Sequence, residues 1–274
     1  MTTMLTGEVV RQGDSGYDAA RISYNHLFPH HPEAVVFCGE TQDVVNAVTW
    51  ARQNNVPVRI RSGGHCLEGW SVVDDGLVID VSRLKSVAID EASMTATVGA
   101  GLNQLEAVTA LGQTGRAAPT GTEGTVGLVG ATLGGGFGLL TRNFGMASDN
   151  LLAAEVVIGP AGGGATTIIA DEENNADLLW ALRGAGNGNF GVVTSLTYRT
   201  HPLTQTIYVV ATWPGLEDVS DVFELWQQCA PHADNRLTSQ LEIRRDEIVL
   251  TGALASGSES WLPTPAKYGM PSWS

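Results

Sequence analysis

The sequence predicts an α+β fold in which a mixed α/β domain ends near residue 203 and the start of a further layer follows. Three observations lead to this prediction: a strand–helix–strand pattern at residues 34–61, glycine clusters between apolar runs, and a shift in composition after residue 203. The 274 residues are 43% hydrophobic and 16% charged, so the chain can bury a core, which a disordered chain cannot.

The first unit is the stretch AVVFCGETQDVVNAVTWARQNNVPVRIRSGGH. AVVF is a short apolar run, and Thr41 is the expected N-cap of a helix with Val44, Val45 and Val48 on one face. VPVRIRS alternates apolar and basic residues, as a half-buried strand does. These elements predict a βαβ unit whose second strand leads directly into a glycine-rich loop.

The later elements follow from the same reasoning. In the first domain we expect short strands in 77–101, a helix over 103–111, a strand pair in 150–170, a helix over 177–183 and a strand in 189–203. After residue 203 we expect a strand at 207–213, a helix at 218–230 and a strand at 248–254. Residues 256–274 lack periodicity and read as an irregular tail.

Charge and cysteine content exclude several function classes. The net charge is −14 with only 15 basic residues, which argues against nucleic-acid binding and against anionic membrane surfaces. Three cysteines (Cys38, Cys66 and Cys229) have no metal-ligand spacing and indicate a reducing compartment. The N-terminus shows no leader pattern, and no apolar run approaches the ~20 residues of a membrane span. We therefore expect a cytoplasmic protein without a metal site; the sequence does not indicate its oligomeric state.

The first candidate site is RSGGHCLEGW, residues 61–70. A strand that ends in Ser-Gly-Gly allows successive N–H groups to turn inward and bind an anion, and Ser62 adds a hydroxyl. The alternative is a tight turn with no ligand. His65 likewise has two interpretations, a structural histidine or a residue that contacts whatever the loop holds.

Two further glycine-rich segments carry candidate chemistry. In TVGLVGATLGGGFGLLTRNFGMASDN, four glycines at 134–138 allow backbone to lie against a planar ligand or simply to cross another element closely. In RGAGNGNFGVVT, residues 183–194, the glycines open onto a strand and not a helix. The nicotinamide-dinucleotide fingerprint requires a helix at that point, so this segment does not support it.

Taken in order, the three segments resemble a known family. RSGGHCLEG, GLVGATLGGGFGLLTRNFGMASDNLLAAEVV and LLWALRGAGNGNFGVVTSL are similar to the FAD-binding domain of the berberine-bridge-enzyme-like oxidases. These oxidases are a branch of the vanillyl-alcohol-oxidase, or PCMH-type FAD, flavoproteins that includes 6-hydroxy-nicotine-oxidase-like proteins. The resemblance covers residues 30–203 and continues weakly to residue 255.

The resemblance implies a specific domain organisation. An N-terminal segment, 1–29, precedes a PCMH-type FAD-binding domain of two α/β subdomains at 30–203. Residues 204–255 are then the truncated start of an antiparallel substrate-domain sheet, and 256–274 are the irregular tail. Relatives carry a longer sheet, which supplies the catalytic base, so the resemblance names no base here.

The resemblance also implies site residues. His65 matches the family histidine that is bonded covalently to the 8α-methyl carbon of the flavin. The positions expected around the FAD are Arg59, Arg61, Ser62, Gly63 and Gly64 at the pyrophosphate, Gly69 in the same loop, Thr125, Gly127, Gly130 and Ala131 along the flavin, Gly191 and Val193 near the adenine, and Asp149 with Asn150 at the end of the second segment.

One departure from the family bears on the cofactor. Many relatives attach the flavin a second time through a cysteine in a G-x-C-x-T-V-G stretch, and here that stretch is GTEGTVG with Glu123 at the cysteine position. A carboxylate cannot form the thioether, so we expect a single covalent bond, through His65.

The resulting hypothesis is an FAD-dependent oxidase that takes a hydride from an alcohol, sugar or amine carbon of a small substrate and uses dioxygen as acceptor. Two alternatives stay open. One is a truncated flavin-binding module without turnover. The other is a noncovalent FAD enzyme that is reduced by a pyridine nucleotide, which predicts no flavin bond to His65.

Overall fold

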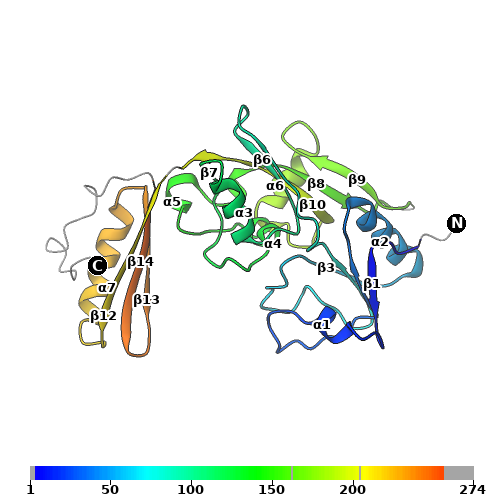
Figure 1. The fold of residues 1–274 in the computed structure, drawn as a ribbon, viewed down its shortest axis with the longest axis horizontal. Helices are drawn as coiled ribbons and strands as arrows, with labels where there is room; N and C mark the ends of the chain where they lie inside the picture. The colour runs from blue at the N-terminus through cyan, green and yellow to red at the C-terminus, as the bar shows by residue number, and fades with distance from the viewer. Residues whose placement is uncertain (1–3, 162, 204, 256–274) are drawn as a thin grey trace.

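The computed structural model describes residues 4–161, 163–203 and 205–255. Four sheets with short helices between them make up this part of the chain (Figure 1). The helices are α1 (Tyr17–Arg21), α2 (Thr41–Asn54), α3 (Gln104–Gly112), α4 (Leu128–Leu133), α5 (Thr141–Phe144), α6 (Ala176–Ala185) and α7 (Val219–Cys229), with 3₁₀ turns at Ser148–Asn150 and Ala230–His232.

The first sheet has the order β1-β2-β4-β3 and is built from β1 (Glu8–Arg11), β2 (Ala34–Phe37), β3 (Val58–Arg61) and β4 (Leu77–Asp80). β4 pairs in parallel with both β2 and β3, and β1 pairs antiparallel with β2. All four residues of β4 are buried, as expected for a central strand with both faces covered. β1 thus joins the predicted N-terminal segment to the sheet of the following domain.

The second sheet is antiparallel, with the order β5-β6-β10-β8-β9. Its strands are β5 (Val87–Asp90), β6 (Thr95–Gly99), β8 (Leu151–Ile158), β9 (Thr166–Ala170) and β10 (Val192–Arg199). The predicted strand pair in 150–170 is confirmed as β8 and β9. β7 (Arg116–Ala117) and β11 (His201–Pro202) pair antiparallel as a separate two-stranded sheet.

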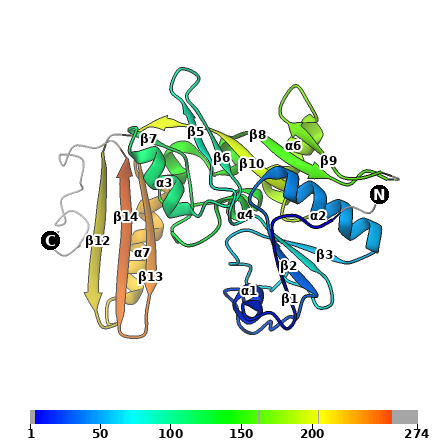
Figure 2. The ribbon, with the colours of Figure 1, turned by 45° about the vertical axis from the view of Figure 1, so that its right-hand side comes forward.

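Helix α2 lies between these two sheets (Figure 2) and contacts β4 on one side and β8 and β10 on the other. Val44, Ala47 and Ala51 of α2 are buried in one core with residues of both sheets. Thr41 is the first residue of the helix and not its N-cap, which is Glu40. The Thr41 hydroxyl donates instead to Glu155 Oε1 of β8 at 2.8 Å, so it ties the helix to the second sheet.

The C-terminal part is a separate antiparallel sheet, β12-β14-β13, at one end of the molecule (Figure 1). It consists of β12 (Thr206–Pro214), β13 (Leu237–Ile243) and β14 (Glu247–Ala255), with α7 beside it. None of the residues of α7 is buried. Arg142 reaches across from α5, where its Nη2 donates to the carbonyl of Ala233 at 2.7 Å and its Nη1 to that of Ala230.

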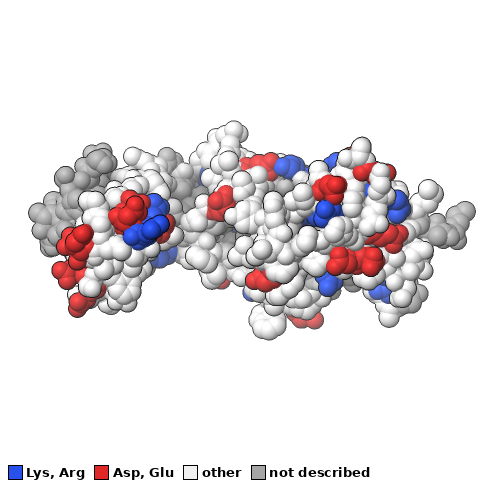
Figure 3. Space-filling view, turned by 90° about the horizontal axis from the view of Figure 1, so that it is seen from below, with Lys and Arg blue, Asp and Glu red and all other residues white. Residues whose placement is uncertain are grey.

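Charged side chains are spread over the surface. On the face in Figure 3 the basic side chains lie singly or beside acidic ones, without a continuous basic area. Within residues 4–255, gaps at 162 and 204 aside, no helix combines the length and hydropathy needed to cross a bilayer. The predicted tail, 256–274, lies outside the described residues.

Candidate FAD site

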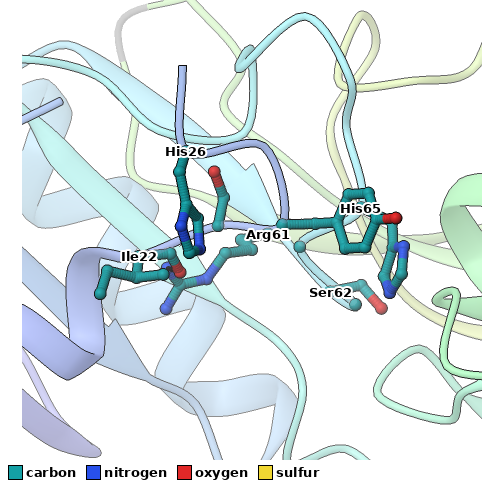
Figure 4. A pocket seen from close by; sticks show the side chains of 9 residues that line it. Ile22, His26, Arg61, Ser62 and His65 are labelled. Carbon is teal, nitrogen blue, oxygen red and sulfur yellow. Dashed lines mark hydrogen bonds between the residues drawn. The ribbon is translucent and has the colours of Figure 1, made fainter. Parts of the chain in front are cut away.

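An open pocket of about 340 Å³ lies where two segments meet. One segment follows α1 and the other follows β3, the strand that leads into the predicted loop. Ser62 and His65 lie on one side of the pocket, and Ile22, His26 and Arg61 on the other (Figure 4). The remaining lining residues are Ser23, Tyr24, Gly63 and Gly64.

The loop after β3 presents unpaired backbone donors to this pocket. The N–H groups of Gly63, Gly64 and His65 donate to no residue in the described part of the chain. Gly64 has a φ of +70°, which a residue with a side chain adopts only at an energetic penalty. Ser62 Oγ donates to the carbonyl of Ala100 at 2.7 Å and anchors the loop at the second sheet. Adjacent free N–H groups of this kind bind anions.

Two of the predicted glycine-rich segments touch each other directly at the backbone. A Cβ on Gly63 would lie 2.3 Å from the nitrogen of Gly127, and a Cβ on Gly127 would lie 2.6 Å from the nitrogen of Gly63. No side chain fits on either residue without displacing the other loop. The sequence pattern indicates close approach at both glycines, and the structure shows that they approach each other.

His65 is held by contacts with two different loops. Its ring stacks on Tyr24, with centroids 4.4 Å apart and planes inclined by 19°. Its Nε2 lies 3.1 Å from Thr125 Oγ1, so the structure brings together two residues that are 60 positions apart. Thr125 Oγ1 also donates to Glu123 Oε1 at 2.8 Å.

Glu123 binds both donors of Thr125. Its carboxylate accepts the Thr125 hydroxyl and, at 3.1 Å, the Thr125 N–H. These two hydrogen bonds, the side-chain one first, lower the pKa of Glu123 below its ordinary value, and the nearby His65 contributes in the same direction.

The two predicted arginines differ in their surroundings. Arg61 is buried, its Nε donates to Asp80 Oδ2 at 2.5 Å, and its Nη1 donates to the carbonyl of Ile22 at 3.3 Å. A buried guanidinium needs such a partner because desolvation of an unpaired charge is expensive. The exposed Arg59 donates to the neighbouring carbonyl of Val58.

The second glycine-rich segment forms a short helix and then irregular backbone. α4 ends before Gly134, and the following Gly135 and Gly136 have φ values of +113° and +69°. Gly130 lies exposed on α4, and a Cβ there would meet nothing within 4 Å. Its neighbour Ala131 is half-buried on the same helix.

Asp149 and Asn150 make local contacts at the end of this segment. Asp149 Oδ2 accepts the Met146 N–H at 2.8 Å. Asn150 is buried, its Nδ2 donates to the carbonyls of Phe144 and Met146, and its Oδ1 lies 2.7 Å from His201 Nε2. Neither residue lines the pocket at His65.

The remaining predicted positions lie on other elements. Gly191 has a φ of +152°, and a Cβ there would lie 2.7 Å from the carbonyl oxygen of Val157. Val193 is buried on β10 opposite Val156 of β8. Gly69 has a φ of +72°, and a Cβ there would clash with the Phe28 ring.

Sequence reasoning did not identify the contribution of residues 22–26. Tyr24 provides the stacking surface for His65, and its N–H donates to the carbonyl of Gly64 at 2.9 Å. The segment has no periodicity and no glycine pattern, so the sequence carried no signal for it. The Glu123–Thr125 hydrogen bond was also not anticipated, although both residues lie in the GTEGTVG stretch.

Comparison with known proteins agrees with this geometry. Residues 32–166 match the FAD binding domain family. The uncharacterized FAD-linked oxidoreductase YgaK of Bacillus subtilis is 42% identical over 90% of this chain and 54% of its own length. The (R)-6-hydroxynicotine oxidase of Paenarthrobacter nicotinovorans is 34% identical over 79% of this chain and 46% of its own length.

A solved structure extends the similarity to the fold. BBE-like 1 of Physcomitrella patens superposes with a TM-score of 0.88 at 32% identity, over 93% of this chain and 55% of its own. The chain therefore spans about half the length of the relatives that it matches. It has the α+β architecture of a PCMH-type FAD domain, and it belongs to the FAD-linked oxidoreductases of the berberine-bridge-enzyme-like family.

Proposed function

We propose that this chain binds FAD through the loop after β3 and functions as an oxidase of small organic substrates, with dioxygen as the electron acceptor. When bound, FAD supplies the acceptor for a hydride from a carbon next to oxygen or nitrogen. The observation that carries the proposal is the set of unpaired N–H groups of Gly63, Gly64 and His65, which line an open pocket beside Gly127. One relative is an oxidase of 6-hydroxynicotine by name.

The residues present fit an FAD pyrophosphate. Three adjacent N–H donors match the acceptor oxygens of a diphosphate, and they need no lysine, which suits a chain of net charge −14. The contact between Gly63 and Gly127 leaves no room for a Cβ, so main-chain atoms form this wall of the site. In this proposal the Arg61–Asp80 ion pair keeps the end of β3 in place beneath the loop.

We also propose that His65 holds the flavin covalently. Its ring lines the pocket and is fixed by Tyr24 and Thr125, which supports a tethering role. Glu123 stands where many relatives have a second, cysteinyl attachment, and its carboxylate instead binds Thr125. The proposed linkage is therefore a single one.

The test separates binding, linkage and turnover. The purified protein is precipitated with acid, and flavin fluorescence is measured in the pellet and in the supernatant. Flavin in the pellet of the wild type and in the supernatant of a His65→Ala variant supports the proposed linkage. Flavin only in the wild-type supernatant contradicts the linkage but leaves FAD binding standing. Absence of flavin from both fractions, even after incubation with FAD, contradicts the whole proposal.

Turnover is measured independently as hydrogen peroxide released in the presence of small alcohols, sugars and amines. Substrate-dependent peroxide supports the oxidase proposal. Reduction of the bound flavin by a pyridine nucleotide without peroxide release from any of these substrates would instead favour a reductase. Stable flavin binding without either reaction would favour a flavin-binding module.

A further inference from the structure

A hydrogen-bonded series joins the loop after β3 to the GTEGTVG stretch, and its members are Glu123, Thr125 and His65. His65 Nε2 lies 3.1 Å from Thr125 Oγ1, which lies 2.8 Å from Glu123 Oε1. The Thr125 N–H donates to the same Glu123 oxygen at 3.1 Å. The carboxylate thus fixes both the backbone and the hydroxyl of Thr125.

The number of protons available determines the direction of these bonds. An ionised carboxylate only accepts, and the lowered pKa of Glu123 keeps it ionised at neutral pH. A threonine hydroxyl has one proton, and it donates this proton to Glu123. Thr125 Oγ1 therefore offers His65 only a lone pair, and Nε2 has to be the donor. A neutral imidazole with its proton on Nε2 has its lone pair on Nδ1.

The other contacts of His65 leave Nδ1 free. Tyr24 stacks on the face of the ring, and Thr125 occupies its Nε2 edge. Nδ1 makes no hydrogen bond with any residue that the structure describes. Tyr24 thus fixes the plane of the ring and Thr125 fixes its Nε2 edge, while the unprotonated Nδ1 lies at the opposite edge.

We propose that Glu123 and Thr125 are positioning residues for flavin attachment. They hold His65 with its proton on Nε2, present Nδ1 as the bonding nitrogen, and accept the Nε2 proton as the bond forms. This inference rests on the proposed linkage of His65 to the flavin. Glu123, which stands where many relatives have the cysteine of a second flavin attachment, thus assists the attachment through His65.

The attachment balances as follows. Nδ1 forms a bond to the 8α carbon of the flavin while one C–H bond of that methyl group breaks. Nε2 releases its proton to Thr125, whose hydroxyl proton moves to Glu123. The C–H bond leaves its two electrons on the flavin while its proton passes to water, and Glu123 later releases the other proton to water. Dioxygen then takes up the two electrons and two protons and leaves as hydrogen peroxide, and the flavin ends in its oxidised form.

Attachment kinetics test this proposal on the full chain. The chain is produced in a riboflavin-starved host, mixed with FAD in air, and sampled over time for acid-stable flavin fluorescence. Thr125→Val removes the hydroxyl at nearly constant volume, and we expect attachment to slow by roughly 100-fold, the lower end of the range for a positioned proton acceptor. Glu123→Gln keeps the shape but not the charge. It should also slow attachment, but less than Thr125→Val does, because the amide oxygen can still accept the Thr125 hydroxyl.

Two matched variants control for side effects. Thr125→Ser keeps the hydroxyl, and Glu68→Gln removes a carboxylate that lies three positions from His65 without contacting it. Thr125→Ser should attach flavin within about twofold of the wild-type rate because the hydroxyl remains. Glu68→Gln should do so because its exposed carboxylate lies outside the series. Urea midpoints report whether each variant is folded. Thr125 and Glu123 are both exposed, so we expect the midpoints of their variants to equal that of the wild type.

A second readout does not depend on flavin. The ¹⁵N shifts of the His65 ring in the flavin-free chain report the tautomer, and the His65→Ala variant identifies its signals. The expected result is a proton on Nε2 in the wild type and a mixture of tautomers in Thr125→Val. A proton on Nδ1 in the wild type, or wild-type attachment by Thr125→Val, would overturn the proposal. If the wild type attaches no flavin, the linkage fails, and the ring shifts still decide whether the series fixes the tautomer.

Discussion

The loop after β3, which lines the pocket with residues 62–65, and the C-terminal sheet are held in place in different ways. At the pocket, the backbones of Gly63 and Gly127 touch, and Arg61 pairs with Asp80 in the buried interior. The C-terminal sheet has its own buried residues. Among the described residues, none of these belongs to the large core that α2 shares with the first two sheets. Its link to the rest includes Arg142, which binds carbonyls after α7. Substitutions should therefore be far less tolerated at the pocket than at the C-terminal sheet.

The largest effect should come from the buried ion pair beneath the loop. In Asp80→Ala, Arg61 keeps a buried charge without its partner, and we expect a loss of about 3–5 kcal/mol in the free energy of unfolding. Urea unfolding measures the change. Asp18→Ala is the control, because the Asp18 carboxylate that pairs with Arg21 is 84% exposed, and the pair should contribute about 0–1 kcal/mol. Equal losses in both variants would contradict the difference in burial on which the comparison rests.

The next effect tests the contact between the two glycines. Gly63→Val places side-chain atoms against Gly127, and we expect a loss of about 1–3 kcal/mol together with loss of bound FAD. Gly112→Ala is the matched control, because it ends α3 outside the predicted site, its Cβ meets nothing within 4 Å, and alanine favours the helix by up to ~1 kcal/mol. The flavin-to-protein absorbance ratio measures binding. Normal flavin content in Gly63→Val would show that the loops separate easily.

An effect that leaves FAD binding intact is expected at the C-terminal sheet. Arg142→Ala removes the hydrogen bonds to Ala230 and Ala233, worth about 1–3 kcal/mol for donors that carry a charge. Limited proteolysis should then cut residues 206–255 faster, while flavin content stays unchanged. Loss of flavin together with the C-terminal sheet would show that the two regions are not independent.

The smallest effect concerns pH. Burial lowers the pKa of His201, with Arg199 contributing in the same direction, and its Nε2 lies 2.7 Å from Asn150 Oδ1. A histidine with a lowered folded-state pKa stabilises the fold above its unfolded pKa, and this stability is lost as the pH falls through the folded-state value. The urea midpoint should therefore fall less in His201→Gln than in the wild type between pH 7 and pH 5. An equal fall would mean that carboxylates alone cause the acid sensitivity.

The sequence predicted elements whose patterns are local. α2 and the β8–β9 pair follow from apolar periodicity, and α3 begins beside Asn103, whose side chain accepts the N–H of Glu106. β13 was missed because its sequence, LTSQLEI, is half polar and it pairs with β14 only through tertiary contact. Its residues are at most half-buried, so no clear hydrophobic alternation marks the strand.

The candidate site shows the same limit. The glycines at 63 and 127 indicate close backbone approach, since only glycine permits it. They do not indicate which segment of the chain approaches. The stacking of Tyr24 on His65 joins segments 41 positions apart and leaves no trace in local pattern. Pair contacts between distant segments depend on the packed fold, whereas the need for a glycine is visible in the sequence itself.

The glycine contact has a further consequence for folding. Gly63 and Gly127 are 64 positions apart, and closing a flexible loop of that length costs on the order of 4 kcal/mol in chain entropy. One glycine follows β3 of the first sheet. The other precedes α4, which packs on α6, and α6 in turn contacts β8 and β9 of the second sheet. Contacts of such long range form slowly. The pocket should therefore form only after both subdomains have docked. The rate at which a refolding chain regains FAD binding would then report the rate of the last folding step.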